Sequence, residues 1–130
     1  MSTKKLKNIF LISIPVFIAH GLEEYFTGFY NIDSFSKFVF GHFESMSIYQ
    51  ATFLIFQIMI WLLLVISFLL ISNNKWQLRL MIIPGLIYIF EIHHIIKALT
   101  SFSYYSGLIT ALPFPIIGFF FWKELLKNFK

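Results

Sequence analysis

Residues 45–74 form a run of the chain that contains no charged side chain. A bilayer core about 30 Å thick needs about 20 helical residues to cross it, and this run exceeds that length. Three further apolar stretches are also long enough to cross. The sequence therefore predicts an all-α fold, a four-helix transmembrane bundle with spans near 7–26, 48–72, 76–99 and 104–123.

The composition agrees with a multi-pass protein of the cell membrane. Hydrophobic residues make up 58% of the 130 residues and charged residues 12%, whereas a soluble domain has about 25% charged residues. Such a chain has too little polar surface to cover a soluble domain and too many apolar residues for disorder. One membrane domain, 1–130, accounts for the whole length, and the lipid bilayer is its expected partner.

The positions of Lys and Arg predict how the helices are oriented. Most of these residues flank the expected spans on one side: Lys4, Lys5, Lys7, Lys75, Arg79, Lys123, Lys127 and Lys130. Lys37 and Lys97 lie on the other side. Because Lys and Arg are enriched in cytoplasmic flanks, both termini are expected in the cytoplasm. The net charge of +4 comes from such membrane-edge residues, so the sequence gives no sign of nucleic-acid binding.

Five ionisable residues inside two expected spans indicate one functional site. His20, Glu23 and Glu24 belong to the first span, and Glu91 and His94 belong to the third. A charged side chain near mid-bilayer costs about 2.5–3.5 kcal/mol on insertion scales and marks a functional site by default. At about 100° per residue, the members of each group share a helix face. Both groups lie about 20 Å from the cytoplasmic edge, since the two spans run in the same direction.

The types of these residues favour a metal site. Histidine and carboxylate ligands without cysteine suit zinc, iron or manganese and argue against copper(I). The candidate metal ligands are His20, Glu23, Glu24, Glu91 and His94. Glu91-x-x-His94 has the spacing found in dimetal helix bundles, but the inventory fits a single ion better. Whichever of Glu23 and Glu24 does not bind the ion is the candidate general base.

Other sequence features concern the surroundings of this site. Tyr105 and Thr110 are the candidate substrate contacts. Prolines inside three expected spans each remove a helical hydrogen bond, which predicts kinks that open a cavity; they are Pro15, Pro84 and Pro113. The segment 28–47 mixes aromatic and charged residues and is expected outside the membrane, as an interfacial lid over the site or as an ordinary aromatic-belt loop.

Residues 20–24, with the sequence H-G-L-E-E, resemble the signature of the HXXEE-motif family of small bacterial membrane proteins. The family pattern continues with a downstream histidine and a Y-x-P-G motif. The histidine corresponds to His93 or His94, and helical periodicity turns His93 away from the carboxylate of that span. Residues 104–107 correspond to the last motif, with Ser106 in place of proline. The family has no assigned activity, so the resemblance implies site residues and no reaction.

Three functions are compatible with these residues. The first is metal binding, and with it a metal-dependent enzyme that acts on a lipid-like or other small hydrophobic substrate. The second is a structural or accessory membrane subunit in which the same side chains form a polar packing network. The third is a proton or cation relay, which a chain this short would provide only as a homo-oligomer. The sequence contains no serine-nucleophile motif, phosphate-binding loop or dinucleotide fingerprint.

Overall fold

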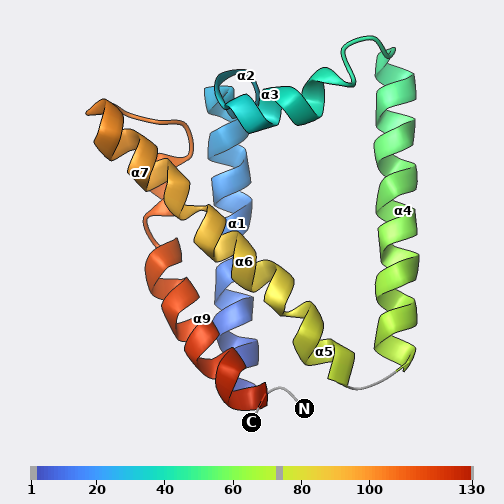
Figure 1. Cartoon of the computed structure of the whole chain (residues 1–130), viewed down its shortest axis with the longest axis vertical. Coiled ribbons are helices and arrows are strands. Elements are labelled where there is room, and N and C mark those ends of the chain that lie inside the picture. Colours follow the sequence, from blue (N-terminus) through green and yellow to red (C-terminus); the bar gives the residue numbers. More distant parts are fainter. Residues whose placement is uncertain (1–2, 73–74, 130) are drawn as a thin grey trace.

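The computed structural model describes residues 3–72 and 75–129, and every regular element within them is a helix. The elements are α1 (Lys4–Thr27), α2 (Phe29–Ile32), α3 (Ser34–Gly41), α4 (Ile48–Ser72), α5 (Lys75–Leu80), α6 (Ile82–Phe90), α7 (Ile92–Ser101), α8 (Leu108–Ala111) and α9 (Phe114–Phe129). In Figure 1, α2 and α3 lie at one end of the molecule and both termini lie at the other. The predicted all-α fold is confirmed for the described residues.

Three helical segments are long and apolar enough to cross a membrane: Lys4–Thr27, Lys75–Ser101 and Leu108–Phe129. They correspond to the first, third and fourth expected spans. The second expected span is the helix α4, in which the described apolar stretch is Ile48–Leu63 and several later side chains lie outside the described residues. Figure 1 places α4 apart from the other long helices. A membrane protein is therefore supported, and the four-helix bundle stays a prediction.

Aromatic side chains and one close helix contact build the core between α1, α6 and α9. Phe114 and Phe121 are fully buried, and both pack against the ring of Tyr88 on α6. Gly118 lets α9 approach α6 closely, because a Cβ there would lie 2.9 Å from Cβ of Tyr88. The Tyr88 hydroxyl donates a hydrogen bond of 2.6 Å to Oγ of Ser13 on α1. One buried side chain thus connects all three helices.

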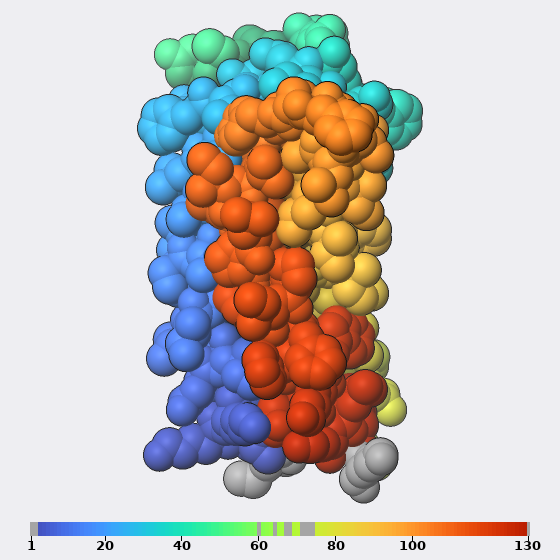
Figure 2. All heavy atoms as spheres, turned by 90° about the vertical axis from the view of Figure 1, so that its left-hand side faces the viewer, coloured from blue at the N-terminus to red at the C-terminus, as the bar shows by residue number. Residues whose placement is uncertain are grey.

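Polar contacts fasten the two ends of the described chain to each other. The backbone N–H of Thr3 donates to Oδ1 of Asn128 over 2.8 Å. Lys5 and Lys127 approach the carboxylate of Glu124 to 3.1 and 3.2 Å. Figure 2 shows the blue α1 beside the red α9 at this end of the molecule. Both ends of the described chain therefore lie on one side of the molecule.

The breaks between helices follow the prolines only in part. The α5–α6 break falls at Met81, shortly before Pro84, and Pro113 separates α8 from α9. The helix α1 continues through Pro15 without a break. The junction of α6 and α7 falls at Glu91, which no proline precedes closely. This last break places a carboxylate in the middle of a membrane-length segment.

Candidate metal centre

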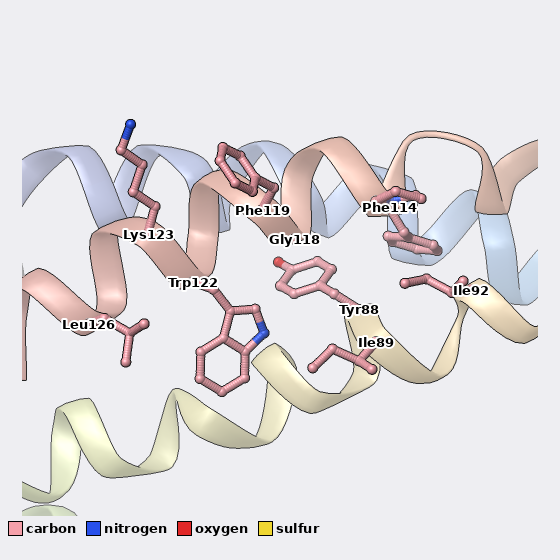
Figure 3. Close-up of a pocket in the computed structure, with 10 residues that line it drawn as sticks. Tyr88, Ile89, Ile92, Phe114, Gly118, Phe119, Trp122, Lys123 and Leu126 are labelled. Carbon is pink, nitrogen blue, oxygen red and sulfur yellow. The ribbon is translucent and has the colours of Figure 1, made fainter.

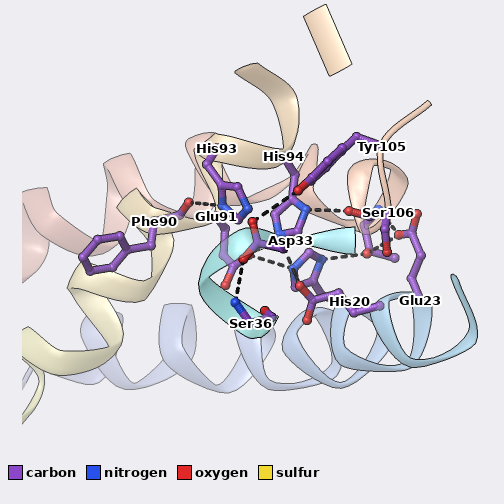
Figure 4. Close-up of polar contacts among 12 residues, drawn as sticks. His20, Glu23, Asp33, Ser36, Phe90, Glu91, His93, His94, Tyr105 and Ser106 are labelled. Atoms are coloured by element: carbon purple, nitrogen blue, oxygen red, sulfur yellow. Dashed lines mark hydrogen bonds and ion pairs between the residues drawn. The ribbon is translucent and has the colours of Figure 1, made fainter. Parts of the chain in front are cut away.

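Four side chains from two helical segments meet inside the described part of the molecule. His20 and Glu24 come from α1, and Glu91 and His94 come from the α6–α7 junction and α7. One ligand atom of each lies within 4.8 Å of the others, so this four-residue group could hold a metal ion. The histidines are buried, with exposed fractions of 3% and 0%, whereas the carboxylates are half-buried. Figure 4 shows both rings close to Glu91.

The contacts within the four-residue group are short but poorly directed. Oε2 of Glu91 lies 2.7 Å from Nε2 of His20 and 3.1 Å from Nε2 of His94. Oε1 of Glu24 lies 3.6 and 3.3 Å from the same two nitrogens. Even so, both Nε2 atoms and Oε2 of Glu91 are buried without a hydrogen-bond partner among the described residues. Buried polar atoms are nearly always hydrogen-bonded, so these three converging atoms require either a proton between a ring nitrogen and the carboxylate or a cation between all three.

The proton position on His94 follows from its other ring nitrogen. Nδ1 lies 2.6 Å from the backbone carbonyl oxygen of Ser106. A carbonyl oxygen only accepts, so Nδ1 carries the proton and donates it. In the neutral ring, Nε2 then holds a lone pair that points into the four-residue group. A histidine that binds a metal through one nitrogen usually donates its other N–H to a carbonyl or carboxylate in this way.

The proton position on His20 likewise follows from the partner of its Nδ1 atom, which is the Thr110 hydroxyl. Nδ1 of His20 lies 3.0 Å from Oγ1 of Thr110. The Thr110 hydroxyl donates its single proton to Oε2 of Glu23, so the hydroxyl oxygen accepts from Nδ1 of His20. Nε2 of His20 is therefore also a lone-pair donor in the neutral ring. Both imidazoles are thus oriented as metal ligands by groups that the α8 region supplies.

Glu23, the fifth candidate ligand, lies outside the four-residue group. Its Oε1 accepts the Tyr104 hydroxyl at 2.6 Å and the Ile109 N–H at 3.1 Å. Its Oε2 accepts the N–H of Thr110 at 2.8 Å as well as the hydroxyl of that residue. These bonds satisfy N–H groups at the start of α8, which have no partner within that helix. Glu23 therefore joins α1 to α8, and Thr110 contacts Glu23 and His20.

The turn before α8 rests directly on the two histidine rings. Gly107 has a φ of +83°, and a Cβ there would lie 2.9 Å from Cε1 of both His20 and His94. Only a residue without a side chain meets both demands at low cost. The motif 104–107 was selected from the sequence by resemblance, but the hydrogen bond between the Ser106 carbonyl and the ring of His94 was not predicted. Every residue has a main-chain carbonyl, so its identity does not reveal such a contact. Only Gly107 could have indicated that the turn lies close to the rings.

A cavity of about 430 Å³ opens beside the four-residue group. Glu24, Glu91 and His94 line it, and so do Asp33 and Phe35 from the α2–α3 segment. That segment lies at the end of the molecule opposite the termini (Figure 1). The α2–α3 segment thus forms part of the cavity wall, and its role as a lid or as an ordinary loop stays a prediction.

Asp33 is bonded on both of its oxygens. Oδ2 accepts the backbone N–H of Ser36 at 2.9 Å, which caps α3, and Oδ1 accepts the Tyr105 hydroxyl at 3.3 Å. Burial acts to raise the pKa of this carboxyl, but the hydrogen bonds outweigh burial and lower its pKa below the usual value. Burial and the charge of Asp33 raise the pKa of the Tyr105 hydroxyl. From the sequence, Asp33 was one of several charged residues in the segment 28–47, and only its position as a helix N-cap could have singled it out.

His93 does not belong to the four-residue group. Its Nδ1 donates to the carbonyl oxygen of Phe90 over 2.8 Å, and its ring lines the cavity beside Asp33. Of the two adjacent histidines, the structure therefore brings His94 to His20, in agreement with the helical periodicity.

A second cavity, of about 400 Å³, lies between α6 and α9. Its lining is mostly apolar and includes Ile89, Phe119 and Trp122, with Lys123 also beside it (Figure 3). None of the residues that line it, all of them described, belongs to the four-residue group. This cavity is therefore separate from the candidate metal centre.

Comparison of the chain with protein-family models, with curated proteins and with solved structures finds no match. The resemblance to the HXXEE-motif family thus rests on the motifs quoted above and stays a prediction.

Proposed function

We propose that this is an integral membrane protein that binds one divalent metal ion through His20, Glu24, Glu91 and His94. The observation that carries the proposal is the set of buried, unpartnered atoms: Nε2 of both rings and Oε2 of Glu91. Both Nδ1 atoms are meanwhile engaged by groups outside the site. Two imidazole nitrogens with two carboxylates suit zinc, iron or manganese.

Charge balance supports the same proposal. Two ionised carboxylates, one in each of two membrane-length segments, are costly unless they are paired. As ligands bound through Nε2, His20 and His94 are neutral, so they do not neutralise Glu24 and Glu91. A dication between the four side chains balances both carboxylates and satisfies the unpartnered atoms at the same time.

We further propose that the ion serves a reaction on a lipid-like substrate. A divalent ion supplies a Lewis acid that polarises a bound oxygen or carbonyl group. The cavity beside Glu24, Glu91 and His94 supports this role, because a catalytic metal needs a side that faces the substrate. Glu23 already accepts four hydrogen bonds, so within this proposal it orients Thr110 and His20 and leaves proton transfer to other groups.

Elemental analysis of the detergent-purified protein tests the metal. After reconstitution with zinc, iron or manganese, we expect one ion per wild-type chain and almost none in His94→Ala or Glu91→Gln. The matched control is His42→Ala, because His42 is an exposed histidine outside the group. Circular dichroism and gel filtration show that each variant is folded. Wild-type protein that takes up none of the three metals would overturn the proposal and favour a polar packing network in an accessory subunit.

A further inference from the structure

We propose that the cavity beside the four-residue group binds an amphiphile with a protonated amine as its head group, and that Asp33 selects this head group. The inference names the substrate class of the proposed function. Binding of the amphiphile itself does not require the metal, so the two proposals can fail separately.

The position of the cavity makes it the approach to the metal centre. Glu24, Glu91 and His94 belong both to the four-residue group and to the cavity lining. His94 is completely buried, and its Nε2 has no hydrogen-bond partner among the described residues. A volume of about 430 Å³ is within the range of small-molecule sites. It accommodates a head group and the first part of a chain, not a whole lipid.

The charge of the cavity favours a cation. Three carboxylates line it, those of Glu24, Asp33 and Glu91, and none of the lining residues, all described, is Lys or Arg. A dication in the four-residue group neutralises two of these carboxylates and leaves the charge of Asp33. A phosphate or carboxylate head group placed here would meet that charge at close range, whereas an ammonium group would be attracted to it.

Asp33 retains the capacity to bind such a group. Each of its oxygens accepts one hydrogen bond, from Tyr105 or from the backbone of Ser36. A carboxylate offers about four acceptor positions, so further donors can be accommodated. The lowered pKa of Asp33 keeps the carboxyl ionised at neutral pH. A protonated amine has three N–H donors, and two of them can occupy the remaining acceptor positions.

Aromatic residues of the cavity supply the apolar part of the site. Phe29, Phe35 and Phe90 belong to its lining, and ring faces attract an ammonium group within about 6 Å. Phe35 and Phe90 are 74% and 70% exposed, so they form an open edge at the surface of the molecule. In a membrane protein this edge lets the alkyl chain extend from the cavity into surrounding lipid.

Native mass spectrometry in a nonionic detergent tests the proposal, with dodecylamine, dodecanol and dodecanoate as probes. We expect a one-to-one dodecylamine complex at a concentration about tenfold or more below that for the other two probes, since a hydrogen bond to a charged group is worth at least a decade of affinity. Asp33→Asn should weaken dodecylamine binding about tenfold, while Asn still accepts the Ser36 N–H. Glu44→Gln is the control, because Glu44 is an exposed carboxylate outside the cavity.

The same spectra report the metal by its mass, which separates the two proposals. Selective dodecylamine binding without bound metal supports this inference and contradicts the proposed metal centre. Bound metal with equal binding of all three probes contradicts this inference and leaves the metal centre standing. Dodecylamine binding that is unchanged in metal-loaded Asp33→Asn would also overturn the role of Asp33.

Discussion

Replacement of Gly107 by alanine is the sharpest test of how the two histidines are held. The new Cβ would lie 2.9 Å from Cε1 of His20 and of His94, whereas carbon atoms in contact prefer about 3.5–4.0 Å. The rings would have to move by roughly 0.6–1 Å, and metal-ligand distances tolerate only about 0.2 Å. We therefore expect Gly107→Ala to weaken metal binding about 10–100-fold, the usual effect of disturbing groups that orient ligands.

Two other glycines separate this steric effect from backbone strain. Gly28 also has a positive φ, +71°, but a Cβ there would contact nothing within 4 Å. Gly28→Ala therefore carries only the left-handed strain, about 1–2 kcal/mol of folding stability. Gly21, inside α1, has neither a positive φ nor a neighbour within 4 Å. Gly21→Ala should keep wild-type metal affinity and gain stability from better helix propensity.

Metal affinity is measured by competition with a chelator of known affinity, and folding stability by thermal unfolding in the same detergent. We expect both Gly107→Ala and Gly28→Ala to lower the folding stability. Only Gly107→Ala should lower the metal affinity. Equal metal affinity in these two variants would refute the claim that the turn positions the rings.

Three further predictions concern single contacts. Thr110→Val removes the hydroxyl that connects His20 to Glu23, and should lower metal affinity about tenfold in the chelator assay while Thr110→Ser retains it. Tyr88→Phe removes the bond to Ser13 and should lower the free energy of unfolding by about 1 kcal/mol without changing metal affinity. Because the folded pKa of Asp33 is lowered, its charge stabilises the fold above the unfolded pKa of about 3.9 and this contribution is lost as pH falls through the folded value. The stability difference between wild type and Asp33→Asn should therefore narrow on acidification, as denaturation at several pH values would show.

The lengths of the apolar runs were sufficient to predict the helical fold, and helical periodicity together with depth was sufficient to predict that His20 meets Glu91 and His94. Both helices carry these residues at similar depth, and hydropathy sets that depth once the spans are known. Periodicity could not separate Glu23 from Glu24, since both lie on the His20 face of α1. Their difference comes from α8, whose first N–H groups bind Glu23. Such a choice depends on how a distant segment docks.

Other features of the fold and of the site could not be predicted, because they do not depend on the type of any one side chain. The helix break at Glu91 has no nearby proline. The acceptor for His94 is a backbone oxygen at residue 106, which serine and proline both possess. The departure from the Y-x-P-G motif at this position therefore leaves the observed contact intact. The separation of α4 from the core in Figure 1 has no counterpart in its sequence, which is uncharged and predominantly apolar.

The order of residues along the chain determines when the four-residue group can form during synthesis. Its members lie in the first and second of the three membrane-length segments, whereas Ser106 and Thr110, which orient the two rings, lie just before and within the last. Chains emerge from the ribosome N-terminus first, so the ligands are synthesised before the groups that hold them. The nascent protein has no formed centre until α8 docks. A metal ion bound there with wild-type affinity would therefore report that α8 has docked against α1 and α7.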